Sequence, residues 1–345
     1  MKTRCIITFL SVLFLITAFS ASALGQTTIT IDTVPVGDPG NAPDTEVMSD
    51  GTTGYGSLSY IYNMGKYEVT AAQYTDFLNH VAATDTYGLY TTRMIDPFYW
   101  GCKIQRSGSP GSYTYRVAAD WANRPVNWVS YWDACRFANW LHNGQPTGAQ
   151  NASTTEDGAY AINRYNGTDG RTIQRKADWK WAVTSEDEWY KAAYYKGTSN
   201  SYWDYPMQSD VPTLPSNDLI NPDPGNNANF FQSGYTITGY NYRTEAGEFE
   251  NSASHYGTFD QGGNVWEWNE AMPSIYYSYA YRGLRGGSFY SSDGTLLASY
   301  RDYYYLPTYE SQYMGFRVSA VPEPSSILIL GSGLLALAGF IRRKR

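Results

Sequence analysis

A block of six residues in the C-terminal third of the chain combines a glycine turn with hard oxygen ligands: Gly263-Asn264-Val265-Trp266-Glu267-Trp268. A turn that glycine permits can point backbone carbonyls inward, such as that of Val265. The Asn264 amide and the Glu267 carboxylate add two further oxygens, and Ca²⁺ binds sets of this kind. The structural alternative is that Asn264 caps a turn while Glu267 pairs with Arg285 or Arg317. The sequence leaves both open.

Cysteine and histidine chemistry is sparse. The chain has three cysteines, too few for a disulfide scaffold or a cysteine-rich zinc site. Cys5 lies in an N-terminal leader, and Cys135 lies on the apolar stripe of a predicted helix, which favours a buried packing role. A disulfide between Cys102 and Cys135 needs a geometry that the sequence does not show. The three histidines (His80, His142 and His255) have no metal-ligand spacing.

Composition excludes several classes of protein. Aromatic residues make up 17% of the chain, with 33 Tyr and 11 Trp, and such content excludes disorder for most of it. The 32 Gly and 16 Pro exclude a coiled coil. The net charge of −7 argues against a nucleic-acid partner.

Both ends of the chain have the composition of targeting segments. Basic residues, the apolar run from Cys5 to Phe19 and the small residues Ala21-Ser22-Ala23 predict a secretory signal peptide over residues 1–23. At the other end, Val321-Pro322-Glu323-Pro324 precedes an apolar stretch, Ser325 to Ile341, and a final Arg-Arg-Lys-Arg. About 17 residues is the short limit for a membrane-spanning helix. The basic end is expected to stay cytoplasmic.

The C-terminal order of features resembles the PEP-CTERM sorting signal of Gram-negative bacteria. The resemblance implies recognition by exosortase-type sorting machinery, removal of the tail, and release or attachment at the cell envelope. The alternative is a permanent single-span anchor. Without the basic residues of both ends the formal charge changes from −7 to −13, so the exported body is acidic. It would repel acidic polysaccharides unless divalent cations bridged them.

Between the two ends the sequence predicts an irregular α+β domain. Residues 24–59 form an N-terminal strand, around Thr27–Ile31, and a loop. Cap residues and apolar periodicity predict three helices, over 71–82, from Ser130 to Asn143, and from Ser185 to Gly197. Short strands are expected around 286–289 and 315–318. No internal repeat is present.

Seven sequence blocks in order resemble the formylglycine-generating enzyme (sulfatase-modifying factor) family, over residues 60–320. They are Lys66-Tyr67-Glu68-Val69-Thr70, Arg124-Pro125-Val126-Asn127-Trp128, Thr184-Ser185-Glu186-Asp187-Glu188-Trp189, Ala228-Asn229-Phe230, Gly263 to Trp268, Leu284-Arg285-Gly286-Gly287-Ser288-Phe289 and Gly315-Phe316-Arg317-Val318. The resemblance implies an irregular, loop-rich variant of the C-type lectin fold. Residues 321–345 then form the sorting signal.

The resemblance also implies Ca²⁺ at Asn264, Val265 and Glu267. A second family calcium site would use Asn229 together with a later Asp. Between Asn229 and Arg243 the chain has no Asp or Glu, so this second site lacks its acidic ligand. Asn241 could replace it only as a weaker, neutral ligand.

Family members that generate formylglycine use two cysteines that bind Cu(I), and soft thiolates are what Cu(I) requires. Those cysteines follow the Gly-Gly-Ser block. Here residues 288–301 contain no cysteine, and Ser291 stands where the first is expected. We therefore expect the fold without the copper chemistry.

Two functions stay open. The first is a non-catalytic binding or structural module of the cell envelope or extracellular matrix, stabilised by Ca²⁺, with an extracellular polysaccharide or surface protein as partner. The second is an enzyme of altered chemistry, an oxidoreductase or hydrolase that uses Ser291, Asp293 and Arg301. Six tyrosines crowd the segment that follows these residues. They either stack on ligands from the surface or fill the core: Tyr300, Tyr303, Tyr304, Tyr305, Tyr309 and Tyr313.

Overall fold

The computed structural model describes residues 28–237 and 242–322. The predicted signal peptide and the apolar segment Ser325–Ile341 lie outside these residues. Within the described part of the chain, none of the helices has the length and apolar character needed to cross a bilayer.

Three α-helices form where the sequence predicts them: α1 (Ala71–Val81), α2 (Tyr131–His142) and α3 (Glu186–Tyr194). Each begins with a capping box, in which a Thr or Ser side chain accepts a hydrogen bond from the third helical backbone N–H and the third side chain bonds back to the cap. Helix α3 ends before the predicted Gly197, because Tyr195 is extended. Short 3₁₀ helices span Thr92–Met94 (η1), Pro97–Tyr99 (η2), Ala119–Trp121 (η3), Gly197–Ser199 (η4) and Asp293–Thr295 (η5).

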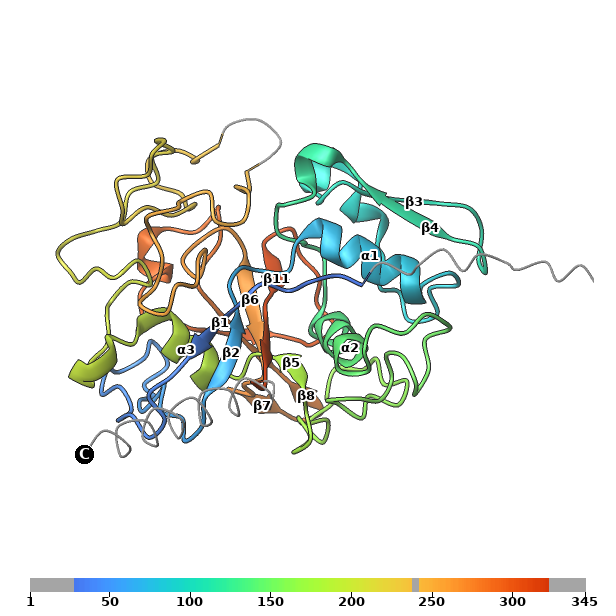
Figure 1. Cartoon of the computed structure of the whole chain (residues 1–345), viewed down its shortest axis with the longest axis horizontal. Coiled ribbons are helices and arrows are strands. Elements are labelled where there is room, and N and C mark those ends of the chain that lie inside the picture. Colours follow the sequence, from blue (N-terminus) through green and yellow to red (C-terminus); the bar gives the residue numbers. More distant parts are fainter. Residues whose placement is uncertain (1–27, 238–241, 323–345) are drawn as a thin grey trace, which may run out of the picture.

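Two four-stranded sheets lie between α3 on one side and α1 and α2 on the other (Figure 1). The first has the order β1 (Thr33–Val36), β2 (Tyr62–Gly65), β12 (Val318–Ala320) and β5 (Trp181–Val183), all antiparallel. The second has the order β10 (Asp302–Tyr305), β9 (Arg282–Arg285), β6 (Trp266–Asn269) and β11 (Met314–Phe316), with β6 and β11 parallel. Two hairpins are added: β3 (Ile104–Ser107) with β4 (Thr114–Val117), and β7 (Ile275–Tyr276) with β8 (Tyr279–Ala280).

The predicted strands differ from those observed, and the differences have local causes. The N-terminal strand begins at Thr33, where it pairs with β2, rather than near residue 27. The strand expected over 286–289 ends instead at Arg285, since Gly286 and Gly287 take φ angles of +94° and +75°. The strand expected over 315–318 is two strands, β11 and β12, on either side of Arg317. The chain passes from one sheet to the other at this residue.

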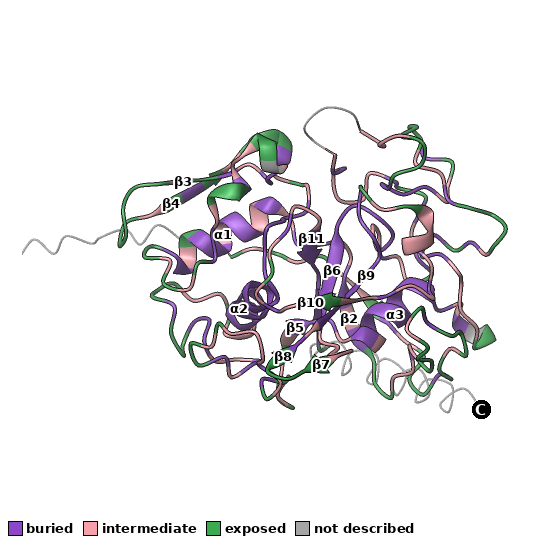
Figure 2. Cartoon of the chain, turned by 180° about the vertical axis from the view of Figure 1, so that it is seen from behind, coloured by how far each residue is buried: buried purple, intermediate pink, exposed green. Residues whose placement is uncertain are grey.

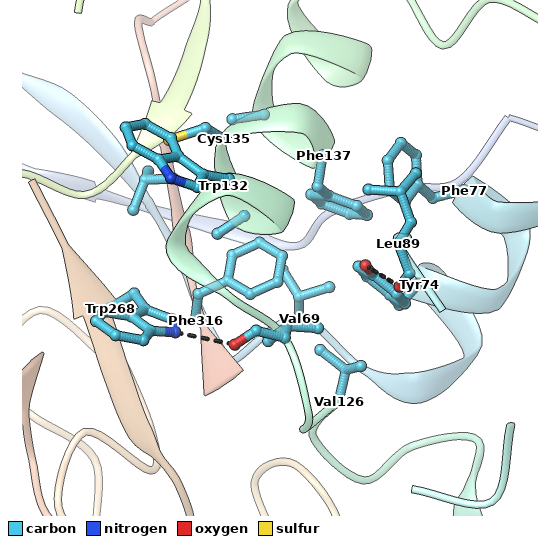
Figure 3. Packing of buried hydrophobic residues seen from close by; sticks show 14 of the residues in the cluster. Val69, Tyr74, Phe77, Leu89, Val126, Trp132, Cys135, Phe137, Trp268 and Phe316 are labelled. Atoms are coloured by element: carbon cyan, nitrogen blue, oxygen red, sulfur yellow. Dashed lines mark hydrogen bonds between the residues drawn. The ribbon is translucent and has the colours of Figure 1, made fainter. Parts of the chain in front are cut away.

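The largest buried cluster joins α1, α2 and the strands beside them. Figure 3 shows Phe137 of α2 between Phe77 and Phe316. The Trp268 indole N–H donates a hydrogen bond to the Val129 carbonyl. In Figure 2 the buried residues concentrate on α2, α3 and the central strands, while the hairpins and long loops carry the exposed ones. Much of the aromatic excess therefore fills a loop-rich core.

Candidate functional site

Glu267 lies on β6 opposite Arg285 in register, but its partner is Arg317. The two side chains form a bidentate ion pair, with Arg317 Nε 2.6 Å from Oε2 and Nη2 2.5 Å from Oε1. The Trp189 indole N–H donates a third hydrogen bond to Oε2 at 2.7 Å. Both charged side chains are fully buried. Arg285 pairs with Glu186 instead, so the structure selects one of the two arginines that the sequence left open.

Asn264 has a left-handed backbone, with φ of +59°, and its amide joins three segments of the chain. Its Oδ1 accepts hydrogen bonds from Asn229 Nδ2 at 3.0 Å and from the Thr244 backbone N–H at 3.2 Å. Its Nδ2 donates to Glu68 Oε2 at 3.4 Å. Its backbone N–H donates to the Asn229 carbonyl, and its carbonyl accepts from the Phe289 N–H. The predicted ligands Asn229 and Asn264 are therefore brought together.

Calcium needs six to eight oxygen ligands, so the partners of the side-chain oxygens in this arrangement bear on whether the ion can bind. Asn264 Oδ1 and both Glu267 oxygens already accept hydrogen bonds from N–H donors, whereas Glu68 Oε1 and Asn229 Oδ1 are buried without a partner. Within residues 28–237 and 242–322, no three His, Cys, Asp or Glu side chains gather as metal ligands. The hydrogen bonds and the ion pair of Asn264 and Glu267 support the ion-pair alternative. Calcium at Asn264, Val265 and Glu267, and at a second site with Asn229, stays a prediction.

Three acidic side chains act on the single positive charge of Arg317: Glu68, Asp260 and Glu267. Burial, followed by the negative charges of Asp260 and Glu267, raises the pKa of Glu68. Burial likewise raises the pKa of Asp260 to about 6, although a hydrogen bond from the Gly247 N–H opposes the shift. Arg317 is therefore shared electrostatically by three acidic groups, and only Glu267 holds it directly.

Of the three residues considered for altered catalysis, Ser291 and Asp293 lie two positions apart, whereas Arg301 belongs to a buried ion-pair network. The Ser291 hydroxyl lies 3.1 Å from both the Ser288 N–H and the Ser288 hydroxyl. Asp293 begins η5. Arg301 is almost fully buried and pairs with Glu186 at 2.5 Å and Asp50 at 3.1 Å. Because its charge is already shared by two carboxylates, Arg301 serves an internal network that also contains Arg285.

An aromatic cluster adjoins Ser291, and sequence patterns alone did not reveal it. Its ring centroids lie 4.8 to 6.1 Å apart. Phe289 is its buried floor, whereas Tyr290 is 52% exposed and Phe231 is also exposed. The Phe231 N–H donates to the Ser291 carbonyl. We call these seven residues the aromatic cluster: Trp100, Phe231, Tyr235, Tyr242, Phe289, Tyr290 and Tyr313.

A buried arginine side chain holds the aromatic cluster in place from the protein interior. Arg243 is fully buried, and its Nη2 donates to the Trp100 carbonyl at 2.8 Å, beside Asn127 Nδ2 at 2.9 Å. Its guanidinium lies 4.9 Å from the Trp121 ring and 5.8 Å from the Phe289 ring. Burial lowers the pKa of Arg243 to about 10. These bonds hold Trp100 in its left-handed conformation, with φ of +50°.

The six tyrosines that the sequence singled out divide between surface and interior. Tyr313 joins the aromatic cluster, and Tyr300 packs on Trp266. Tyr304 and Tyr309 are exposed, and their rings lie on those of Tyr303 and Tyr305. The sequence missed Trp100, Tyr235 and Tyr242 because they come from distant segments. Among the members of the cluster, only Tyr313 is one of the tyrosines that the sequence singled out.

The two cysteines of the body are free and buried in the main core. Cys135 lies on α2, and burial raises the pKa of its thiol to about 12. Burial also raises the pKa of Cys102. Thiols held in this way are poor nucleophiles, so both residues act as packing groups.

Glu310, three residues before Tyr313, supplies a pH prediction. Burial and then the Asp133 charge raise its pKa to about 8, against the opposing effect of Arg93. Because the folded pKa exceeds the ordinary one, the contribution of this group to stability is complete at acid pH and is lost as the pH rises through about 8. Glu310→Gln should therefore raise the unfolding free energy by on the order of 1–2 kcal/mol at pH 9.

The same variant should leave stability at pH 4.5 unchanged, which urea unfolding at the two pH values would measure. Glu46→Gln, in an exposed loop, controls for the loss of one negative charge. An equal gain from Glu310→Gln at both pH values would show that the raised pKa is not the cause.

Comparison with known proteins agrees with this architecture. The sulfatase-modifying factor enzyme 1-like domain matches residues 57–321, and the chain belongs to this family. A PEP-CTERM protein-sorting motif matches residues 320–345, which supports export to the cell envelope and implies exosortase-type sorting machinery. No curated protein matches the chain.

Solved structures share the fold at low identity. The crystal structure of CarF is 20% identical, covers 86% of this chain and 100% of its own, and has a TM-score of 0.53. Variable protein 1 of Treponema denticola is also 20% identical, with 86% and 99% coverage and a TM-score of 0.53. These likenesses confirm the predicted α+β fold, a variant of the C-type lectin fold.

Proposed function

We propose that the exported body is a non-catalytic binding module whose ligand stacks on the aromatic cluster. The observation that carries this proposal is the position of the cluster. It adjoins Ser291, in the segment where the family's copper-binding cysteines are expected and where this chain has none. The site thus offers ring faces and hydroxyl groups in place of thiolates.

An extracellular polysaccharide is the ligand class that this surface favours. Sugar rings have an apolar face that packs on aromatic rings, and their hydroxyl groups bond to groups such as the tyrosine hydroxyls. Buried Arg243 and Asn127 fix Trp100 before binding, so the ligand orders few side chains. The acidic body favours neutral polysaccharides over acidic ones, because like charges repel.

Tyr290→Ala should weaken polysaccharide binding about tenfold, since stacking on one ring is worth on the order of 1 kcal/mol beyond its buried area. A glycan array would first select a ligand, and calorimetry would then compare variants. Tyr304→Ala is the matched control, because Tyr304 is also exposed, at 68%, but lies outside the cluster.

The outcomes separate the alternatives. Loss of binding in Tyr304→Ala but not in Tyr290→Ala would move the site to the tyrosines of β10. Binding of a surface protein in place of any glycan would keep a binding module but change its ligand class. An unchanged affinity in both variants would contradict the proposal.

A further inference from the structure

One face of the molecule gathers exposed apolar and aromatic side chains around the end of the described chain. Figures 1 and 2, seen from opposite sides, both place hairpin β7–β8 at the same edge as the lower ends of the central strands. Tyr277, at the tip of that hairpin, is 80% exposed. We call this surface the exit face, and its exposed members are Tyr60, Ile61, Ile275, Tyr276, Tyr277, Tyr279 and Val321.

Two adjoining hollows connect these residues. A groove of about 400 Å³ is lined by Tyr60, Ile61 and Val321 together with Arg175 and Glu270. A second hollow, of about 270 Å³, shares Arg175 and Glu270. It also includes Met272, from which the chain continues through Pro273 and Ser274 into β7. Arg175, Glu270 and Met272 therefore link the groove beside Tyr60 to the segment that enters the hairpin.

The chain leaves the domain at this surface. Val321 follows β12 directly, and its N–H donates to the Lys180 carbonyl. The apolar segment begins four residues later, at Ser325. Four residues span at most about 14 Å. When that segment is inserted in a bilayer, Val321 therefore lies within about 14 Å of the point where the chain enters it.

The side chains of the face suit that position. Tyrosine and tryptophan concentrate at membrane interfaces, because an apolar ring and a polar tip match the two sides of the boundary. Trp179 lines the same groove as Tyr60, and its ring packs against the Arg175 guanidinium at 4.3 Å. On a face that met only water, exposed apolar residues of this size would promote unwanted association with other proteins.

We propose that the exit face rests on the outer surface of the inner membrane while the C-terminal segment is inserted, with the tyrosines of β7–β8 in the headgroup region. The partner is a lipid bilayer. The proposal depends on the tail and the exit face, not on ligand binding by the aromatic cluster.

The test uses the full chain, with Cys5→Ser, in nanodiscs that contain either ordinary phospholipid or nitroxide-labelled phospholipid. A cysteine at position 277 (Tyr277→Cys) carries an environment-sensitive fluorophore. Cys102 and Cys135 are buried and will not react in the folded protein. Phe98→Cys is the matched control, because Phe98 is 82% exposed on η2, in the segment that leads into β3 of the other hairpin. Ala336→Cys reports on insertion of the tail.

The label at position 277 should be quenched at least about three times as strongly as that at position 98, because interfacial aromatic positions lie within reach of the nitroxides. Equal quenching at positions 277 and 98, with strong quenching at 336, would overturn the proposal. A blue-shifted but unquenched label at 277 would indicate a protein occupant and would also overturn it. Absence of quenching at 336 would also overturn it, because the proposal requires an inserted tail.

Discussion

Glu267→Gln should lower the free energy of unfolding by about 3–5 kcal/mol, because it leaves Arg317 charged and unpaired in the interior. Arg317 keeps hydrogen bonds to the Gly65 and Phe259 carbonyls, but no other carboxylate contacts it directly within the described residues. Urea unfolding at pH 7 measures the loss. The effect is large because Arg317 lies where the chain passes between the two sheets, so relaxation there disturbs both.

The same variant separates the ion pair from calcium. If Glu267 is an ion-pair partner, Glu267→Gln loses the same stability in EDTA as in calcium. If Glu267 binds Ca²⁺, EDTA should destabilise the natural chain and have no further effect on the variant. Asp169→Asn, which removes one carboxylate from the exposed pair with Arg171, should leave the midpoint unchanged. A loss below about 1 kcal/mol for Glu267→Gln would contradict the ion-pair account.

Phe137→Ala should cost about 3–5 kcal/mol, the range for deleting a fully buried aromatic side chain. Phe137 lies at the centre of the main core, with ring contacts to Phe77, Trp140 and Phe316 at 5.3 to 5.7 Å. Its removal opens a cavity between α1, α2 and β11, which capped helices cannot easily close. If denaturant unfolding shows a lower midpoint with an unchanged slope m, the loss of stability arises in the native state.

Phe98→Ala is the control for that deletion, because it removes the same ring from a mainly exposed position. We expect a change within about 0.5 kcal/mol. Equal losses in the two variants would mean that the core does not centre on α2.

The helices could be predicted from sequence and most of the strands could not, for a physical reason. A helix start is local: Thr70, Ser130 and Ser185 each cap the residue three positions later, so the signal lies within one turn. The strands are two to four residues long, and their partners are distant in sequence. β12 pairs with β2, more than 250 residues earlier, and nothing near β12 specifies that partner.

In the candidate site, too, local features could be predicted from the sequence and contacts between distant segments could not. The sequence offered Arg285 and Arg317 as alternative partners of Glu267. It could not choose between Arg285 and Arg317, since register alone places Arg285 opposite Glu267. The aromatic cluster assembles from four separate segments. Tertiary contacts alone bring Trp100 to within 5.0 Å of Tyr242.

The most direct test of the non-catalytic account is an assay for formylglycine formation, a reaction that we expect the chain not to catalyse. The purified full chain, loaded with copper under oxygen, is incubated with a cysteine-containing sulfatase-type peptide, and the peptide mass is measured. We expect no formylglycine product above the protein-free control, because residues 288–301 offer no thiolate for Cu(I) and Cys102 and Cys135 are buried. Formylglycine formation by the chain, lost on removal of copper, would contradict the account.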